Sequence, residues 1–190
     1  MPGSTRSYEM AIRLAKRGHE VHVLTSKRDS KIFSRKWKVE KKQGIYVHWL
    51  SIPYDNKMSY YRRLLSFIYF AYYTSKKGIS LGADLVFATS TPLTIALPAV
   101  RIKNKLKTKM VFEVRDLWPE IPISIGIIKN PIMKYISKKL ELFAYKNSSK
   151  IIGLSSGMCQ GVINTGYNKN NVYCIPNSCD LAPSSLKSKV

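Results

Sequence analysis

Acidic residues are scarce in this chain, which has 11 Asp and Glu against 32 Lys and Arg and a formal net charge of +21. A balance this basic favours an anionic partner, namely a nucleic acid, an anionic lipid or a phosphorylated substrate. Cysteine is also rare, because only Cys159, Cys174 and Cys179 occur, an odd number without the paired spacing of a zinc site. This usage argues against a disulfide framework and favours free thiols in a reducing cytoplasm.

The sequence contains no apolar run long enough to span a bilayer, no internal repeat and no low-complexity segment. With 45% hydrophobic residues the chain is too apolar to be disordered, and its 190 residues can bury one sizeable core. We therefore expect one domain over residues 1–180, followed at 181–190 by a tail or the start of a crossover. His19, His22 and His48 lack ligand spacing, so we expect neither a metal nor another cofactor.

Strands and helices are expected to alternate along the whole chain. Apolar runs with strand character occupy residues 20–25, 46–52, 84–89, 110–114, 150–154 and 171–175, and helical patterns occupy 8–17, 58–77, 92–105, 131–146 and 158–165. This alternation predicts an α/β fold, a Rossmann-like parallel sheet with helices on both faces. We expect the Val111 strand at its centre, with the strands of Val21, Val86 and Ile152 in the same sheet.

Local patterns add detail to this fold. The chain opens with a loop and a helix, so the first strand of the sheet is expected to be missing. The basic segment 26–44 is expected to be a solvated surface loop. In the helix at 131–146, helical spacing assigns these apolar residues to the core face: Ile132, Tyr135, Ile136, Leu140, Phe143 and Ala144.

A charged corner follows the expected central strand. The apolar run 110–114 gives way to Arg115 and Asp116, and Glu120 comes directly after Pro119, which cannot continue a sheet. Ligands bind at the carboxyl ends of strands in open α/β sheets, so these three charged side chains are candidates for a site. The alternative is an Arg115–Asp116 ion pair that only closes the strand.

The expected helix at 58–77 is the second informative stretch. Its apolar residues, many of them aromatic, go nearly all the way round, and no acid occurs between Asp55 and Asp84. Interfacial helices combine aromatic anchors with basic residues in this way. A crossover helix packed on the sheet explains the same pattern, and both interpretations can hold for different faces of one helix. The basic residues that would contact a membrane are Lys57, Arg62, Arg63, Lys76 and Lys77.

Several segments together resemble a known family. They are 2–6 (PGSTR), 14–21 (LAKRGHEV), 83–86 (ADLV), 90–92 (STP), 115–120 (RDLWPE), 155–158 (SSGM) and 175–180 (IPNSCD). In order and spacing they resemble the N-terminal domain of retaining GT-B glycosyltransferases of family 4, the group that includes O-antigen and capsule transferases. The resemblance spans nearly the whole chain, and RDLWPE together with the later IPN is its most specific part.

The resemblance implies a division of labour between two domains. The N-terminal domain binds a lipid-linked or polysaccharide acceptor in cell-surface glycan synthesis, a C-terminal domain holds the nucleotide sugar, and transfer proceeds with retention, usually without a metal. At the matching positions Asp116 and Glu120 can hydrogen-bond sugar hydroxyls, and Arg115 can neutralise a phosphate or hold Asp116 in place. Further substrate contacts are expected from Gly3, Ser4, Thr91, Ser155 and Asn177.

The chain departs from the family pattern in several ways. The first strand is missing, Gly3-Ser4 stands in place of a Gly-Gly pair, and Arg115-Asp116 stands where many relatives carry His-Asp. The nucleotide-sugar domain is also absent, together with its acidic pair. The chain therefore resembles an acceptor-side half that is inactive alone, whether a truncated gene product, an excised piece or one part of a split enzyme. Its expected place is cytoplasmic and peripheral, on the inner face of the membrane.

Two other functions stay open at this point. A basic nucleic-acid-binding module is supported by the charge alone, because the Lys and Arg residues are spread over loops and helix ends and no binding motif occurs. A non-catalytic subunit that docks on another transferase is the third possibility. Nucleic acid is the less favoured partner of these, and anionic membrane and a glycan acceptor are favoured.

Overall fold

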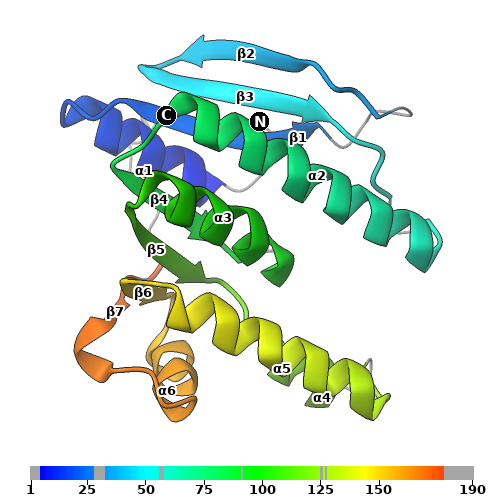
Figure 1. Cartoon of the computed structure of the whole chain (residues 1–190). Helices are drawn as coiled ribbons and strands as arrows, with labels where there is room; N and C mark the ends of the chain where they lie inside the picture. The colour runs from blue at the N-terminus through cyan, green and yellow to red at the C-terminus, as the bar shows by residue number, and fades with distance from the viewer. Residues whose placement is uncertain are drawn as a thin grey trace, which may run out of the picture.

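The computed structural model describes residues 5–27, 33–55, 58–90, 92–124, 126 and 128–177 (Figure 1). Strands and helices alternate along most of the chain, as the sequence patterns predict. The helices are α1 (Thr5–Lys16), α2 (Tyr60–Leu81), α3 (Ala96–Leu106), α4 (Glu120–Ser124), α5 (Pro131–Lys146) and α6 (Ser156–Asn164), with short 3-10 helices η1 (Leu93–Ile95) and η2 (Lys169–Asn171). The strands are β1 (Val21–Lys27), β2 (Trp37–Lys42), β3 (Ile45–Ser51), β4 (Leu85–Thr89), β5 (Lys109–Val114), β6 (Lys150–Gly153) and β7 (Val172–Cys174).

The larger sheet has the order β4-β5-β6-β7, and all its strands are parallel. Strand β5 is internal, with Val86 of β4 opposite Met110 on one side and Ile152 of β6 opposite Glu113 on the other. The predicted central position of the Val111 strand, between the strands of Val86 and Ile152, is therefore confirmed. Because the strands are parallel, all their carboxyl ends lie at one edge of this sheet.

The smaller sheet has the order β1-β3-β2, and it corrects two expectations. The expectation that Val21 shares a sheet with Val111 is wrong, because no described strand pairs with β1 on the side away from β3. The segment 26–44 is not simply a loop, since β2 runs antiparallel to β3 within it. The turn between them uses Gln43 and Gly44 with φ values of 49° and 84°, the positive angles that two-residue hairpin turns need.

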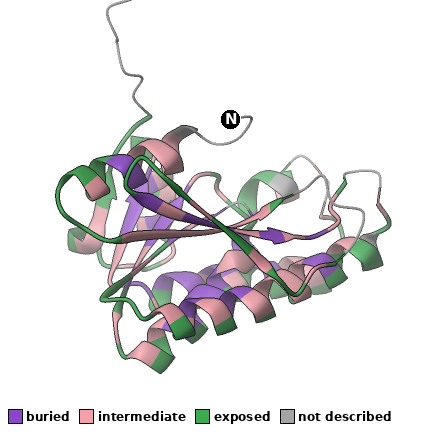
Figure 2. Cartoon of the chain, turned by 90° about the horizontal axis from the view of Figure 1, so that it is seen from above, coloured by how far each residue is buried: buried purple, intermediate pink, exposed green. Residues whose placement is uncertain are grey.

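Helices lie on both faces of the strands, which confirms the predicted Rossmann-like α/β class (Figures 1 and 2). Successive residues of a strand point to opposite faces. On one face, Val21 and Val23 of β1 pack with α1. On the other, Leu24 approaches α2 so closely that a Cβ placed on Gly78 would lie 3.5 Å from Leu24 Cδ1. The same Cβ would lie 2.5 Å from Ile102 of α3, so Gly78 allows α2 to pack tightly beside α3.

The main core lies between the larger sheet and the helices α3, α5 and α6. Met110, Phe112 and Val114 point into it from β5, and the Phe112 ring meets the Tyr145 ring of α5 edge-on at 6.3 Å between centroids. Burying each of these three side chains contributes about 1.5–3 kcal/mol to the stability of the fold. Because side chains alternate along β5, Glu113 points to the opposite face, towards α1.

Helix α5 has the predicted bounds, but its predicted core face is wrong. Asn130 caps the helix by accepting from the backbone N–H of Ile132, and Pro131 occupies the first turn. The residues that face the sheet are Ser137, Glu141, Ala144 and Tyr145. Of the six expected core residues only Ala144 is buried and Leu140 is partly buried, whereas Ile132, Tyr135, Ile136 and Phe143 are exposed.

Helix α2 is turned in the same way. Its inner face carries Ser66, Thr74, Ser75 and Gly78, and all four are buried. Its outer face carries large apolar side chains at helical spacing, and these are exposed: Tyr61, Leu64, Leu65, Ile68 and Tyr72. Among the helices of the described residues, none combines the length and the apolarity that crossing a membrane requires.

Candidate functional site

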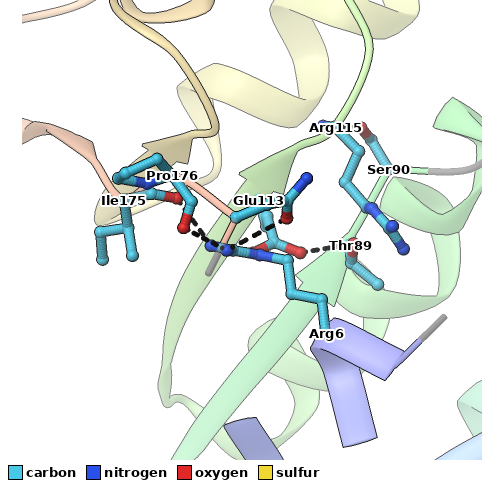
Figure 3. Close-up of polar contacts among 8 residues, drawn as sticks. Arg6, Thr89, Ser90, Glu113, Arg115, Ile175 and Pro176 are labelled. Carbon is cyan, nitrogen blue, oxygen red and sulfur yellow. Dashed lines mark hydrogen bonds and ion pairs between the residues drawn. The ribbon is translucent and has the colours of Figure 1, made fainter. Parts of the chain in front are cut away.

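The candidate site lies at the carboxyl edge of the larger sheet, where β4, β5, β6 and β7 end beside the start of α1 (Figure 3). Buried Glu113 forms its centre, with a side chain that is 0% exposed. Glu113 Oε2 accepts a hydrogen bond from Thr89 Oγ1 at 2.8 Å, and Glu113 Oε1 accepts from Arg6 Nε at 2.8 Å. A buried carboxylate is costly without such partners, so β4 and α1 together stabilise its charge.

Arg6 connects three parts of the chain that are far apart in sequence. In addition to Glu113, its guanidinium donates to the carbonyl oxygen of Ile175 at 2.9 Å and to that of Pro176 at 2.9 Å. It also donates to Asn177 Oδ1 at 3.4 Å. The planar guanidinium offers five donors in a fixed fork, which suits this arrangement. Arg6 therefore holds the segment that leaves β7 against α1 and β5.

Ser90 shapes the corner that follows β5. Its backbone N–H donates to the Glu113 carbonyl at 2.8 Å, and its hydroxyl accepts from the Arg115 backbone N–H at 3.0 Å. Ser90 thereby extends the pairing of β4 with β5 by one residue and fixes the point at which the chain leaves β5. Beyond it, Asp116 and Glu120 are exposed, and Pro119 is buried. The corner thus presents the Asp116 and Glu120 side chains to solvent beside a strand end that Ser90 holds by two hydrogen bonds.

The family-model comparison bears on this edge of the sheet. The model described as Glycosyltransferase Family 4 matches residues 3–183, which includes every strand of the larger sheet and the whole carboxyl edge. The chain belongs to glycosyltransferase family 4. No curated protein matches it. Membership assigns this family 4 domain a general role in glycosyl transfer, with a nucleotide sugar and an acceptor as the general partners.

The predicted site residues of the family 4 domain fall into two groups. Arg115, Asp116, Glu120, Ser155 and Asn177 all lie at the carboxyl edge or directly beyond it. The basic residues Arg62, Arg63, Lys76 and Lys77 lie on α2, with Arg62 and Lys76 exposed and the other two partly buried. Lys57, Gly3, Ser4 and Thr91 lie outside the described residues. The predicted chemical residues and the predicted membrane residues therefore belong to different elements.

Two of the edge residues have structural partners. The Ser155 hydroxyl caps α6 by accepting from the Met158 backbone N–H at 3.2 Å. Asn177 accepts from Arg6, as described above, and so is held in position from the other end of the chain. Sequence reasoning did not identify Arg6 as a site residue. The sequence indicates Arg6 only indirectly. Glu113 lies within an otherwise apolar strand and therefore needs a cation nearby, and Arg6 is a cation in one of the family motifs.

Sequence reasoning also missed Glu141, a second buried acid of the family 4 domain. It lies on the inner face of α5, and burial raises its pKa to about 7. A hydrogen bond with Tyr145 opposes that shift, and the negative charge of Glu120 adds to it. The influence of Glu120 connects this buried acid to the charged corner. A carboxyl group with this pKa gains or loses its proton near neutral pH.

Metal-binding geometry is absent from the described part of the chain, where no three His, Cys, Asp or Glu side chains gather around a common point. The two cysteines in this part, Cys159 and Cys174, are free thiols. Burial and the neighbouring Cys174 raise the pKa of the Cys159 thiol, so it is a poor nucleophile.

Proposed function

We propose that this family 4 domain is the acceptor-binding half of a retaining glycosyltransferase. It would help to move a sugar from a nucleotide sugar to a lipid-linked or polysaccharide acceptor in cell-surface glycan synthesis, of the O-antigen or capsule type. The observation that carries this proposal is the corner after β5, where Arg115, Asp116 and Glu120 stand at the carboxyl edge on a base held by Ser90. Ligands of open α/β sheets bind at this edge.

Each charged residue of the corner has a proposed role. Asp116 accepts a hydrogen bond from the acceptor hydroxyl and orients it towards the sugar donor, since a carboxylate is a strong acceptor for sugar hydroxyls. Glu120 binds a second hydroxyl of the acceptor. Arg115 stabilises the negative charge that develops on the leaving diphosphate. These three groups supply orientation and electrostatic stabilisation.

The donor side of the reaction is proposed to need a second domain. The segment 175–177 is held by Arg6 and belongs to the IPN motif, which in the family resemblance marks the crossover between domains. Asn177, Ser155, Thr91, Gly3 and Ser4 are proposed to contribute substrate contacts around that crossover. In this proposal the chain alone binds acceptor but transfers no sugar.

The proposed location is the cytoplasmic side of an anionic membrane, where a lipid-linked acceptor would be presented. The exposed apolar side chains of α2 support this location, because Tyr61 is 78% exposed and Leu65 is 58% exposed on the same outer face. Arg62 and Lys76 lie next to that face and are exposed, and Lys57, Arg63 and Lys77 add positive charge to the same helix. Each basic residue near an anionic surface contributes about 1 kcal/mol of attraction.

Sugar transfer tests the proposed function directly. The purified chain, incubated with a panel of nucleotide sugars and a polyprenyl diphosphate acceptor, is expected to show no transfer, and measured turnover would contradict the division into two halves. When the chain is joined to the donor-binding half of a family 4 enzyme, Asp116→Asn should lower turnover by about 10²-fold. An unchanged rate in that variant would reduce Asp116 to a structural residue.

A further inference from the structure

A groove lies between α3 and α5, on the exposed side of these two helices. Its volume is about 540 Å³, within the range typical of ligand pockets. Leu97, Val100 and Phe143 provide its apolar lining, and Arg101, Asn104 and Lys105 provide its polar lining. Leu97 is 46% exposed and Phe143 is 37% exposed, so the apolar lining is open to the surroundings. An apolar groove with two cations at its border suits a ligand with an apolar chain and an anionic group.

The groove lies in the middle of a larger apolar surface. Helix α3 packs between α2 and α5, so the outer faces of the three helices form one layer (Figure 1). Both neighbouring helices carry large apolar side chains on their outward faces. On α5, Ile132 is 66% exposed, and it is followed at helical spacing by Ile136 and Phe143. Exposed apolar stripes on two helices that flank an apolar groove mark an interaction surface.

The charges of this helix layer favour an anionic ligand. Helices α2 and α3 contain no acidic residue, and the one acid of α5, Glu141, is buried on its inner side. The exposed basic residues of the layer are Arg62, Lys76, Arg101, Lys105, Lys138, Lys139 and Lys146. An apolar surface on helices that expose basic and no acidic side chains matches an anionic lipid surface, into whose headgroup boundary aromatic side chains insert.

We propose that the α3–α5 groove binds an anionic phospholipid of the membrane. The lipid phosphate pairs with Arg101 and Lys105, and an acyl chain lies against Leu97, Val100 and Phe143. The outer stripes of α2 and α5 rest in the headgroup boundary on either side of this lipid. The inference deepens the membrane location given under the proposed function and rests on it, but it is independent of whether the chain transfers sugar.

The test places a fluorescent reporter in the groove. Phe143→Trp introduces a tryptophan on one wall, and Leu97→Trp introduces one on the opposite wall in case the first variant folds poorly. Vesicles of phosphatidylcholine with 30% phosphatidylglycerol brominated on its acyl chains then quench any tryptophan that touches those chains. The wild-type chain, with Trp37, Trp49 and Trp118, supplies the background. We expect quenching at position 143 or 97 well above that background, and none with vesicles of phosphatidylcholine alone.

Charge-reversal variants separate the groove from general electrostatic attraction. Arg101→Glu with Lys105→Glu should abolish the additional quenching and weaken vesicle binding by at least about tenfold. The matched control is Lys16→Glu with Arg17→Glu at the exposed end of α1, which changes the net charge equally but lies on the opposite side of the sheet. This control should weaken binding less than about threefold, because screening limits charge effects to about 8 Å at physiological salt.

Two results would overturn the proposal. One is quenching of both tryptophan variants no greater than that of the wild type, and the other is an equal loss of binding in the two charge-reversal variants. Arg62→Glu with Arg63→Glu makes the failure of this inference distinguishable from failure of the membrane location. If that variant loses vesicle binding, and the two tryptophan variants with Arg62 and Arg63 intact bind vesicles without being quenched, the domain docks on membrane through α2 and the groove holds no lipid.

Discussion

Removing the guanidinium of Arg6 is expected to destabilise the domain strongly. In Arg6→Ala the carboxylate of Glu113, which is 0% exposed in the wild type, loses its ion pair at 2.8 Å and keeps the hydrogen bond from Thr89. Breaking a buried pair by removing one partner costs about 3–5 kcal/mol, mainly because the remaining charge stays buried without compensation. The carbonyl groups of Ile175 and Pro176 lose their donor as well. For a domain of this size the loss should lower the melting temperature by roughly 6–20 °C.

A surface pair on the same helix provides the matched control. Arg13 pairs with Glu9 at 2.9 Å, almost the same distance, but the two side chains are 49% and 44% exposed. Such an exposed pair contributes about 0.3–0.5 kcal/mol, so Arg13→Ala should change stability little. Urea denaturation of the two variants measures the difference in the free energy of unfolding.

A third variant separates the buried charge from the lost contacts. Glu113→Gln removes the negative charge, keeps the shape of the side chain and leaves Arg6 its carbonyl partners, so its cost should be about 1.5–3 kcal/mol and smaller than that of Arg6→Ala. If Arg6→Ala costs no more than Arg13→Ala, the interpretation of Arg6 as the cation that stabilises Glu113 is refuted. If Glu113→Gln lowers the free energy of unfolding more than Arg6→Ala does, the unpaired charge of Glu113 is not the main cause of the destabilisation.

Three further predictions concern single residues. Burial and nearby positive charges lower the pKa of His48 to about 4, below its value in the unfolded chain. The free energy of unfolding should therefore fall by about 2–3 kcal/mol as pH drops from 6.5 towards 4. His48→Phe should abolish this pH dependence in urea titrations. Glu141 should give the opposite pH dependence, because its pKa is raised to about 7 in the folded protein. Its contribution to the free energy of unfolding is fully present below about pH 4.5 and is lost as pH rises through 7. Glu141→Gln should remove this loss of stability above about pH 5. A Cβ at Gly153 would lie 2.7 Å from Cys159 Sγ, so Gly153→Ala should lower the free energy of unfolding by about 1–3 kcal/mol in urea denaturation. The control is Gly157→Ala, which should not lower it, because no neighbouring atom would lie closer than 4.0 Å to the new Cβ.

The order of elements in this family 4 domain could be predicted because each element carries its own local signal. The buried strands β4, β5 and β6 read as short apolar runs, and α5 begins after an Asn-Pro cap at the residue expected. Parallel pairing then follows from the alternation of strands with helices. The carboxyl edge could be predicted for the same reason, since Arg115 and Asp116 follow directly on the central strand.

What could not be predicted depends on contacts between distant residues. Arg6 and Glu113 are 107 positions apart, and no local pattern connects them. The separation of β1 from the larger sheet depends on strand pairing, which local patterns do not specify. Strand β2 was missed because its sequence, WKVEKK, is basic enough to read as a solvated loop, although its alternation and the following Gln43-Gly44 turn indicate a hairpin.

The reversed face of α5 shows a limit of hydrophobic periodicity. The stripe through Ile132, Ile136 and Phe143 was correctly found as the apolar face of the helix, but periodicity does not specify what that face contacts. The sheet receives Ser137, Glu141 and Ala144 in its place, and Tyr145 supplies the bulk that fills the core. A stripe that is apolar and yet exposed is consistent with the lipid-facing role proposed for the helix layer.

Acceptor binding tests the central claim most directly. The measurement is the affinity of the chain for a polyprenyl diphosphate-linked saccharide in lipid nanodiscs, compared among wild type, Asp116→Asn and Asp84→Asn. Asp84 is an exposed acid just before β4, at the opposite edge of the sheet, so it controls for the change of charge. The wild type and Asp84→Asn should bind alike, and Asp116→Asn should bind about tenfold or more weakly, the effect of losing a hydrogen bond to a charged group. Equal affinity of Asp116→Asn and wild type, or no binding by the wild type, would contradict an acceptor site at this edge.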